Sequence, residues 1–156
     1  MCHWYDLTVY TSKYATCHVN EAGDLVDAQL LIDGNYDVWD DWFMETGQHH
    51  PSIARHITHF NETSLCLSTA MSGGGITIGD SILAFPAIRA GRLALPFRFG
   101  LESSQYYSIF LRAGAKPTAE EMAFRDWLYE VVRLHQKEVG EYLVETGITL
   151  VGRRAS

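Results

Sequence analysis

The chain has 156 residues, of which 47% are hydrophobic and 20% charged, so it can build one globular domain and is not a disordered segment. No apolar run reaches the ~20 residues that a membrane span needs, and no secretory signal opens the chain, so we expect a cytoplasmic protein. The formal net charge is −7 with only 12 Lys and Arg, which predicts no direct DNA binding, because phosphate contacts need a basic face.

The first third of the chain alternates between strand and helix patterns. Residues 6–10 alternate and are rich in β-branched side chains, and 30–32 form a short apolar run closed by a turn, so both predict strands. Three aromatic residues at helical spacing share one face of a helix over 36–46: Trp39, Trp42 and Phe43. Residues 55–60 alternate again and predict a strand with Ile57 pointing inward.

A helix is predicted from Asn61 or Thr63, either of which can cap its N-terminus with a short polar side chain. The glycine run 73–75 ends this helix, because glycine adopts left-handed backbone conformations without a Cβ clash. Residues 76–78 then predict a short strand, and a second helix starts in the stretch 79–81.

The last third predicts one strand and the longest helix. Residues 105–112 form the strand, and Thr118 with Glu121 matches a capping box at the start of a helix that runs to about His135 or further. The apolar stripe expected to be buried on this helix consists of Phe124, Trp127, Leu128, Val131 and Leu134. Strands that alternate with helices predict an α/β fold with a largely parallel sheet.

Several motifs resemble one bacterial family, the LysR-type transcriptional regulators. The resemblance covers about residues 6–136, and within the family the sequence is most similar to the subgroup of the glycine-cleavage activator. It rests on the Trp pair in Trp39-Asp40-Asp41-Trp42, on Phe60-Asn61-Glu62-Thr63-Ser64-Leu65, on Ala70-Met71-Ser72-Gly73-Gly74-Gly75-Ile76-Thr77-Ile78-Gly79, on Ala90-Gly91-Arg92-Leu93-Ala94-Leu95-Pro96-Phe97 and on Ala123-Phe124-Arg125-Asp126-Trp127-Leu128.

The resemblance implies a periplasmic-binding-protein-like (type 2) fold, in which two α/β lobes flank a cleft that binds a small effector. It makes residues 1–136 a partial effector-binding domain, with 12–95 as the second lobe and 105–136 as the return strand and terminal helix of an incomplete first lobe. Residues 137–156 would be a C-terminal extension. The family's DNA-binding domain and the opening half of the first lobe have no counterpart in this sequence.

The helix that begins near Asn61 is the best candidate for a ligand site. Its N-terminal N–H groups and the side chains of Asn61, Thr63 and Ser64 suit a carboxylate or another small anion, although an ordinary helix cap would have the same residues. By resemblance, this helix end faces the effector cleft, and Gly75 and Ile76 begin a strand that borders it.

Other reactive side chains favour structural roles, and no catalytic residue, metal or cofactor is predicted. The histidines of a cluster at 49, 50, 56 and 59 lack an HExxH pattern, and on a strand His56 and His59 point to opposite faces. Asp37, Asp40 and Asp41 match the solvated face of the helix that carries the two Trp residues. Cys2, Cys17 and Cys66 form no CxxC, so we expect reduced thiols, with Cys66 buried on a helix.

The sequence therefore predicts a non-enzymatic module that senses a small effector for a LysR-type regulator and lacks that regulator's DNA-binding domain. The alternative is an interaction protein without a ligand, which dimerises with itself or with full-length regulators. In either case we expect a homodimer, closed by the 105–112 strand, the terminal helix and the apolar tail over 142–151.

Overall fold

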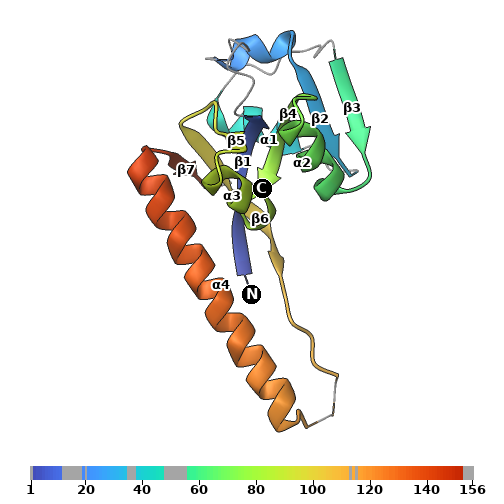
Figure 1. Cartoon of the computed structure of the whole chain (residues 1–156), viewed down its shortest axis with the longest axis vertical. Coiled ribbons are helices and arrows are strands. Elements are labelled where there is room, and N and C mark those ends of the chain that lie inside the picture. The colour runs from blue at the N-terminus through green and yellow to red at the C-terminus, as the bar shows by residue number, and fades with distance from the viewer. Residues whose placement is uncertain are drawn as a thin grey trace.

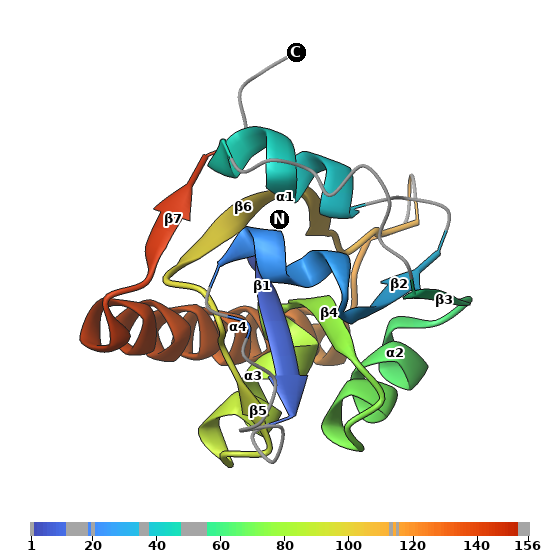
Figure 2. The same cartoon turned by 90° about the horizontal axis from the view of Figure 1, so that it is seen from above.

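A computed structural model describes residues 2–11, 19, 21–34, 38–47, 56–112, 114 and 116–152. They form a seven-stranded sheet with helices on both faces and a long helix that extends past one end of it (Figures 1 and 2). The strands are β1 (Cys2–Thr11), β2 (Gln29–Asp33), β3 (His56–Phe60), β4 (Ile76–Asp80), β5 (Leu93–Ala94), β6 (Phe99–Tyr107) and β7 (Thr149–Val151). The helices are the 3-10 turn η1 (Ala22–Val26), α1 (Val38–Thr46), α2 (Thr63–Met71), α3 (Ser81–Arg89) and α4 (Ala119–Thr146).

The sheet is largely parallel, as predicted. Its order is β3-β2-β4-β1-β6-β7, with β5 paired to β1. Strand β2 runs parallel to β3 and β4, and β6 runs parallel to β7, whereas β1 is antiparallel to both β4 and β6. All strands on this path except β1 therefore point the same way, which confirms the α/β class.

Each face of the sheet carries its own hydrophobic core, because successive residues of a strand point to opposite faces. In β2, Leu31 faces the core beneath α2, α3 and the end of α4, whereas Leu30 and Ile32 face the core beneath η1 and α1. The second core is centred on the fully buried ring of Trp42, whose centroid lies 5.0 Å from that of Phe97. The predicted Trp stripe is therefore a core stripe.

Helix α4 is the longest helix, and it begins at the capping box that the sequence predicts. The Thr118 hydroxyl accepts from the backbone N–H of Glu121 at 3.2 Å, and the Glu121 carboxylate accepts from the backbone N–H of Thr118 at 2.7 Å. The helix passes residue 136 without a break, and Val139 and Leu143 in its second half are buried against the sheet. Strand β7 then pairs with Phe99–Leu101 of β6.

The first half of α4, the end of β6 and the segment 108–112 form a projection that we call the arm (Figure 1). Here the prediction of a buried stripe is wrong, because Phe124, Trp127, Val131 and Leu134 are all exposed. Helical spacing predicts that side chains share a face, but it does not predict that another element covers that face.

Two smaller expectations also differ from the structure. The strand predicted over 105–112 ends at Tyr107, because the partner β1 begins at Cys2 and pairs with Tyr107 there. Ile57 is 46% exposed, because β3 lies at the edge of the sheet. Within the chain, the last residues of the apolar tail pair with β6 as strand β7 at Thr149–Val151.

Candidate functional site

Three parallel strands end at one edge of the sheet, which we call the carboxyl edge. β2 ends there at Asp33, β3 at Phe60 and β4 at Asp80, and helices α2 and α3 begin beside these ends. In open α/β sheets, ligands bind outside the carboxyl ends of parallel strands. The carboxyl edge is therefore the place in this fold at which a small ligand is most readily held.

Asp80 caps α3 at this edge. Its Oδ1 accepts hydrogen bonds from the backbone N–H groups of Ile82 at 2.9 Å and Leu83 at 2.8 Å. Burial raises the pKa of the Asp80 carboxyl, although these two N–H donors oppose the shift, and the nearby charge of Asp33 raises the pKa further. Two of the N-terminal N–H groups of α3 are thus occupied by the helix's own N-cap residue.

The N-terminus of α2 is different, and the predicted caps are wrong. Neither Asn61 nor Thr63 caps this helix: the N-cap residue is Glu62, and its side chain makes no capping hydrogen bond. The Thr63 hydroxyl instead donates to the carboxylate of Asp33, which turns it away from the capping position. Ser64 Oγ lies 3.4 Å from a Glu62 carboxylate oxygen, a long contact on an exposed surface. The first turn of α2 therefore presents backbone N–H groups that no described side chain caps.

The five residues proposed from the sequence fall into two groups. Asn61, Thr63 and Ser64 lie together at the carboxyl edge, beside Asp33. Gly75 and Ile76 lie at the opposite end of β4, where Ile76 is buried and pairs with Leu30 near the start of β2. A strand of this length spans roughly 13 Å, so the two groups do not line one small-ligand site.

A buried polar chain lies between α2 and the first half of β4. The Thr77 hydroxyl donates to the backbone carbonyl of Leu31 at 3.1 Å, and the Cys66 sulfur lies 3.1 Å from the same hydroxyl oxygen. Burial raises the pKa of the Cys66 thiol to about 11, although the Thr77 contact opposes the shift. The thiol is therefore protonated at neutral pH and joins α2 to β4 as a structural group.

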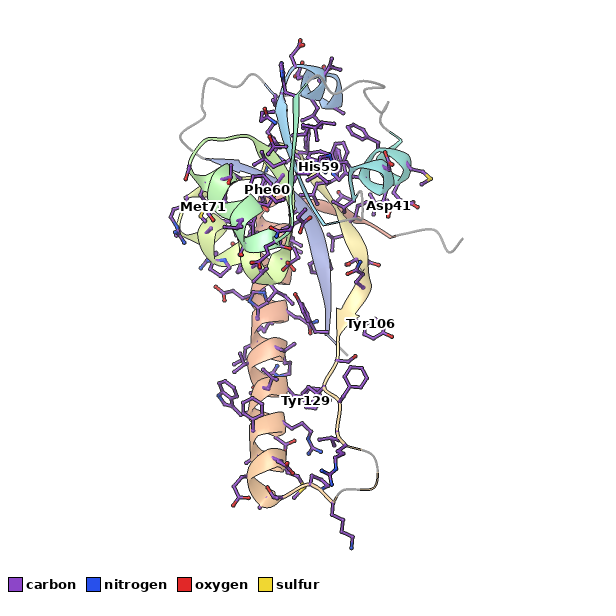
Figure 3. All side chains as sticks on the ribbon, turned by 90° about the vertical axis from the view of Figure 1, so that its right-hand side faces the viewer. Asp41, His59, Phe60, Met71, Tyr106 and Tyr129 are labelled. Atoms are coloured by element: carbon purple, nitrogen blue, oxygen red, sulfur yellow. The ribbon has the colours of Figure 1, made fainter. Side chains whose placement is uncertain are left out.

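The remaining candidate groups from the sequence do not converge. His56 and His59 are exposed on the edge strand β3, while Asp40 and Asp41 lie on α1, on another part of the molecule (Figure 3). Within the described residues, no three His, Cys, Asp or Glu side chains come close enough to hold a metal ion. Asp37, His49, His50 and Cys17 lie outside the described residues.

Sequence reasoning missed Asp33 and Asp80. Both directly follow apolar strand residues, Leu30-Leu31-Ile32 in one case and Ile76-Thr77-Ile78-Gly79 in the other. A charged residue at the end of a buried parallel strand is the signal that could have placed them at the carboxyl edge.

Comparison with known proteins agrees with this architecture. A family model described as the LysR substrate binding domain matches residues 18–133. The glycine cleavage system transcriptional activator of Escherichia coli (strain K12) is 24% identical over 115 residues, which are 74% of this chain and 37% of that protein. The HTH-type transcriptional activator AmpR of Enterobacter cloacae is 25% identical over 115 residues, 74% of this chain and 39% of that protein.

The fold has a solved counterpart in the effector domain of the transcriptional regulator AmpR of Pseudomonas aeruginosa. The two structures superpose with a TM-score of 0.72 at 19% identity, over 88% of this chain and 64% of the AmpR domain. The chain spans little more than a third of the length of its curated relatives. Among the described helices, none combines the length and the apolar character of a membrane span. Because the family model covers most of the sequence, the chain belongs to the LysR substrate-binding domain family, with its periplasmic-binding-protein-like fold.

Proposed function

We propose that this chain is a cytoplasmic effector-sensing module of a bacterial LysR-type regulator, that it catalyses no reaction, and that DNA binding resides outside it. The observation that carries the proposal is the N-terminus of α2, which no side chain of the described residues caps, beside the Asp33 carboxylate. Family membership supports the same class of function, because the curated relatives are transcriptional activators. The proposed ligand residues at the carboxyl edge are Asn61, Thr63 and Ser64.

The chemistry of this edge favours an effector that carries one negative and one positive group. Backbone N–H groups at the start of α2 suit a carboxylate, in line with the small anion expected from the sequence. The Asp33 carboxylate, which accepts from Thr63, lies beside those donors and would repel a purely anionic ligand. An ammonium group on the same ligand would pair with Asp33. We therefore propose a small zwitterion, such as an amino acid, as the effector class.

A thermal-shift screen followed by calorimetry tests the proposal. The probes are amino acids, the matching carboxylic acids without an amino group, and the matching amines without a carboxylate. We expect amino acids to raise the melting temperature most, because only they satisfy both groups. Replacing Thr63 and Ser64 together by Ala should weaken binding by about 1–3 kcal/mol, because two hydrogen-bonding hydroxyls are lost beside a charged ligand.

The matched control is the double variant Ser68→Ala and Ser72→Ala, which changes the second half of α2 and its C-cap, away from the start of the helix. These hydroxyls donate to the carbonyls of Ser64 and Ser68 within α2, so their loss should leave affinity unchanged. Equal affinities for both double variants would remove the site from the start of α2.

A second candidate function is an interaction protein without a ligand, which assembles with itself or with full-length regulators. The exposed apolar arm favours it. A screen in which no amino acid or carboxylate stabilises the chain, together with stable self-association, would favour this function over effector sensing.

A further inference from the structure

Both pairings of strand β1 are interrupted at the same level of the sheet. Its pairing with β4 ends at Asp6, which lies opposite Asp80, the last residue of β4. On its other side, the pairing with β6 changes register between Tyr5 and His3. Beyond this level, the described part of β1 pairs with β6 alone, and Figure 1 shows the start of β1 and the end of β6 running together away from the sheet.

The change of register is a bulge in β6. Between the pair Tyr5–Glu102 and the pair His3–Tyr106, β1 covers two residues and β6 covers four, so β6 carries two extra residues. A bulge interrupts the ladder and bends the strand locally. The bulge therefore divides the two strands into a part inside the sheet and a part beyond it, from the pair His3–Tyr106 outward, which we call the outer ribbon.

Ser81 takes the place of a strand neighbour for Tyr5. If the ladder between β1 and β4 continued by one step, Ser81 would lie opposite Tyr5. Ser81 is instead the first residue of α3, where a backbone carbonyl accepts its hydrogen bond within the helix. Its side chain substitutes for that carbonyl, because Ser81 Oγ accepts a hydrogen bond from the backbone N–H of Tyr5 at 3.1 Å. Ser81 is only 3% exposed, so little water competes for this bond.

The Ser81 bond joins two elements, whereas the other serine bond at the bulge does not. Asp80 Oδ1 accepts from two backbone N–H groups of α3, which fixes the first turn of the helix, and Ser81 with it, at the end of β4. Within the bulge, Ser103 Oγ accepts from the backbone N–H of Gln105 at 3.2 Å, so this bond stays inside β6. The bond from Tyr5 to Ser81 is thus the one that connects β1 to the start of α3.

We propose that the Ser81 hydroxyl is a latch, which holds the outer ribbon in line with the sheet and whose release lets the outer ribbon bend at the bulge as a separate unit. A ribbon of two strands is only marginally stable alone, so one hydrogen bond at its base has a large effect. The end of β6 belongs to the arm, so the latch connects the carboxyl edge, where α3 begins, with the arm. The inference concerns the fold and does not depend on effector binding.

Amide hydrogen exchange of the full chain, followed residue by residue by NMR, tests the latch in the variant Ser81→Ala. An amide exchanges with solvent when its hydrogen bond opens. The Tyr5 amide should exchange at least about tenfold faster in the variant than in the parent, because it has lost its acceptor. The amide of Val9, a residue that pairs with Thr77 of β4, should change less. An equal acceleration of both amides would overturn the latch, because the substitution would then weaken the whole sheet.

The matched control is Ser103→Ala, the same change at the other serine of the bulge. In this variant the Gln105 amide should exchange faster, whereas the Tyr5 amide should keep the rate of the parent. A Tyr5 amide that responds equally to both substitutions would contradict the proposal, because the bulge as a whole would then hold the outer ribbon.

The parent chain tests the separate movement without any substitution, so this arm holds even if Ser81→Ala does not fold. Low concentrations of urea distinguish local from global opening, since only an opening that exposes much surface responds strongly to urea. We expect the amides of residues 2–5 and 105–107 to exchange through an opening that urea hardly changes, and those of residues 7–10 through one that urea promotes. One urea-dependent opening shared by both groups would overturn the proposal, because the outer ribbon would then open only with the sheet.

Discussion

The backbone of Gly75 passes so close to Gln29 that a Cβ atom on Gly75 would lie 2.4 Å from the Gln29 carbonyl oxygen. Gly75 also has a φ of +153°, a conformation that L side chains rarely adopt. The carbonyl belongs to the backbone of β2 and cannot rotate away. This contact fixes how the chain leaves α2 and enters β4, and it requires glycine.

Gly75→Ala should therefore lower the free energy of unfolding by at least about 1–3 kcal/mol, the usual cost of such backbone strain. Gly140→Ala is the matched variant with the opposite sign. A Cβ on Gly140 would meet nothing within 4 Å, and alanine in a helix interior stabilises by about 0.5–1 kcal/mol relative to glycine. Urea unfolding of both variants measures the difference, and equal effects would contradict this reading of the Gly75 contact.

Replacing Asp80 should separate its capping role from its charge. Asp80→Ala removes the acceptor for two backbone N–H groups and should cost about 0.5–2 kcal/mol. Asp80→Asn keeps an acceptor oxygen and should cost less. Chemical denaturation at a fixed pH measures both, and a larger loss for the Asn variant would contradict the capping role.

The stability difference between the parent and Asp80→Asn should depend on pH, with a defined sign. Because burial raises the pKa of Asp80 in the folded state, the folded chain binds that proton more tightly than the unfolded chain does. The stabilisation from this carboxyl is fully present below the unfolded value of 3.8 and is lost as pH rises through the raised folded pKa. Across that window the stability of Asp80→Asn should rise relative to the parent, and a relative fall would contradict the direction of the shift.

Trp42 should be the most sensitive position of α1. It is fully buried, and its ring centroid lies 4.9 Å from those of Phe43 and Phe99. Trp42→Ala should destabilise by about 3–5 kcal/mol through lost burial and the cavity that remains. Met44 on the same helix is 69% exposed, so Met44→Ala should stay within about 0.5 kcal/mol of the parent. Thermal unfolding of the two variants makes the comparison.

The chain should not bind duplex DNA specifically. Its net charge is −7, and the described cations are in part paired on the surface, as Arg89 is with Glu138 at 3.4 Å. A gel-shift assay at physiological ionic strength should show no sequence-specific complex. A specific shift that persists as salt is raised would contradict the prediction, since non-specific phosphate contacts weaken steeply with salt.

The elements whose pattern depends on local chemistry were predictable. The capping box at Thr118, the helix exit at Gly73–Gly75 and the buried strand around Leu31 all agree with the sequence analysis. The family resemblance is confirmed by the family model.

What could not be predicted depends on contacts between distant segments. The role of Thr63 changes because Asp33, thirty residues earlier, accepts its hydrogen bond. Trp127 is exposed because no described element packs over it, and the periodicity of the sequence cannot predict whether such an element is present. Gly75 and Thr63 are close in sequence, but they lie at opposite edges of the sheet, because α2 runs back along the sheet between them.

Helix α4 also has a mechanical consequence. It is 28 residues long, and it packs against α3 through the ring of Phe85. The centroid of this ring lies 5.7 Å from the ring centroid of His135 and 5.4 Å from that of Tyr142. The axial distance from Leu143 to the first turn of α4 is about 36 Å. A rotation of α4 by about 10° around Leu143 would therefore displace the first turn by about 6 Å. Asp80 is the N-cap of α3, so a displacement of α3 that tilted α4 would be largest at the arm's tip.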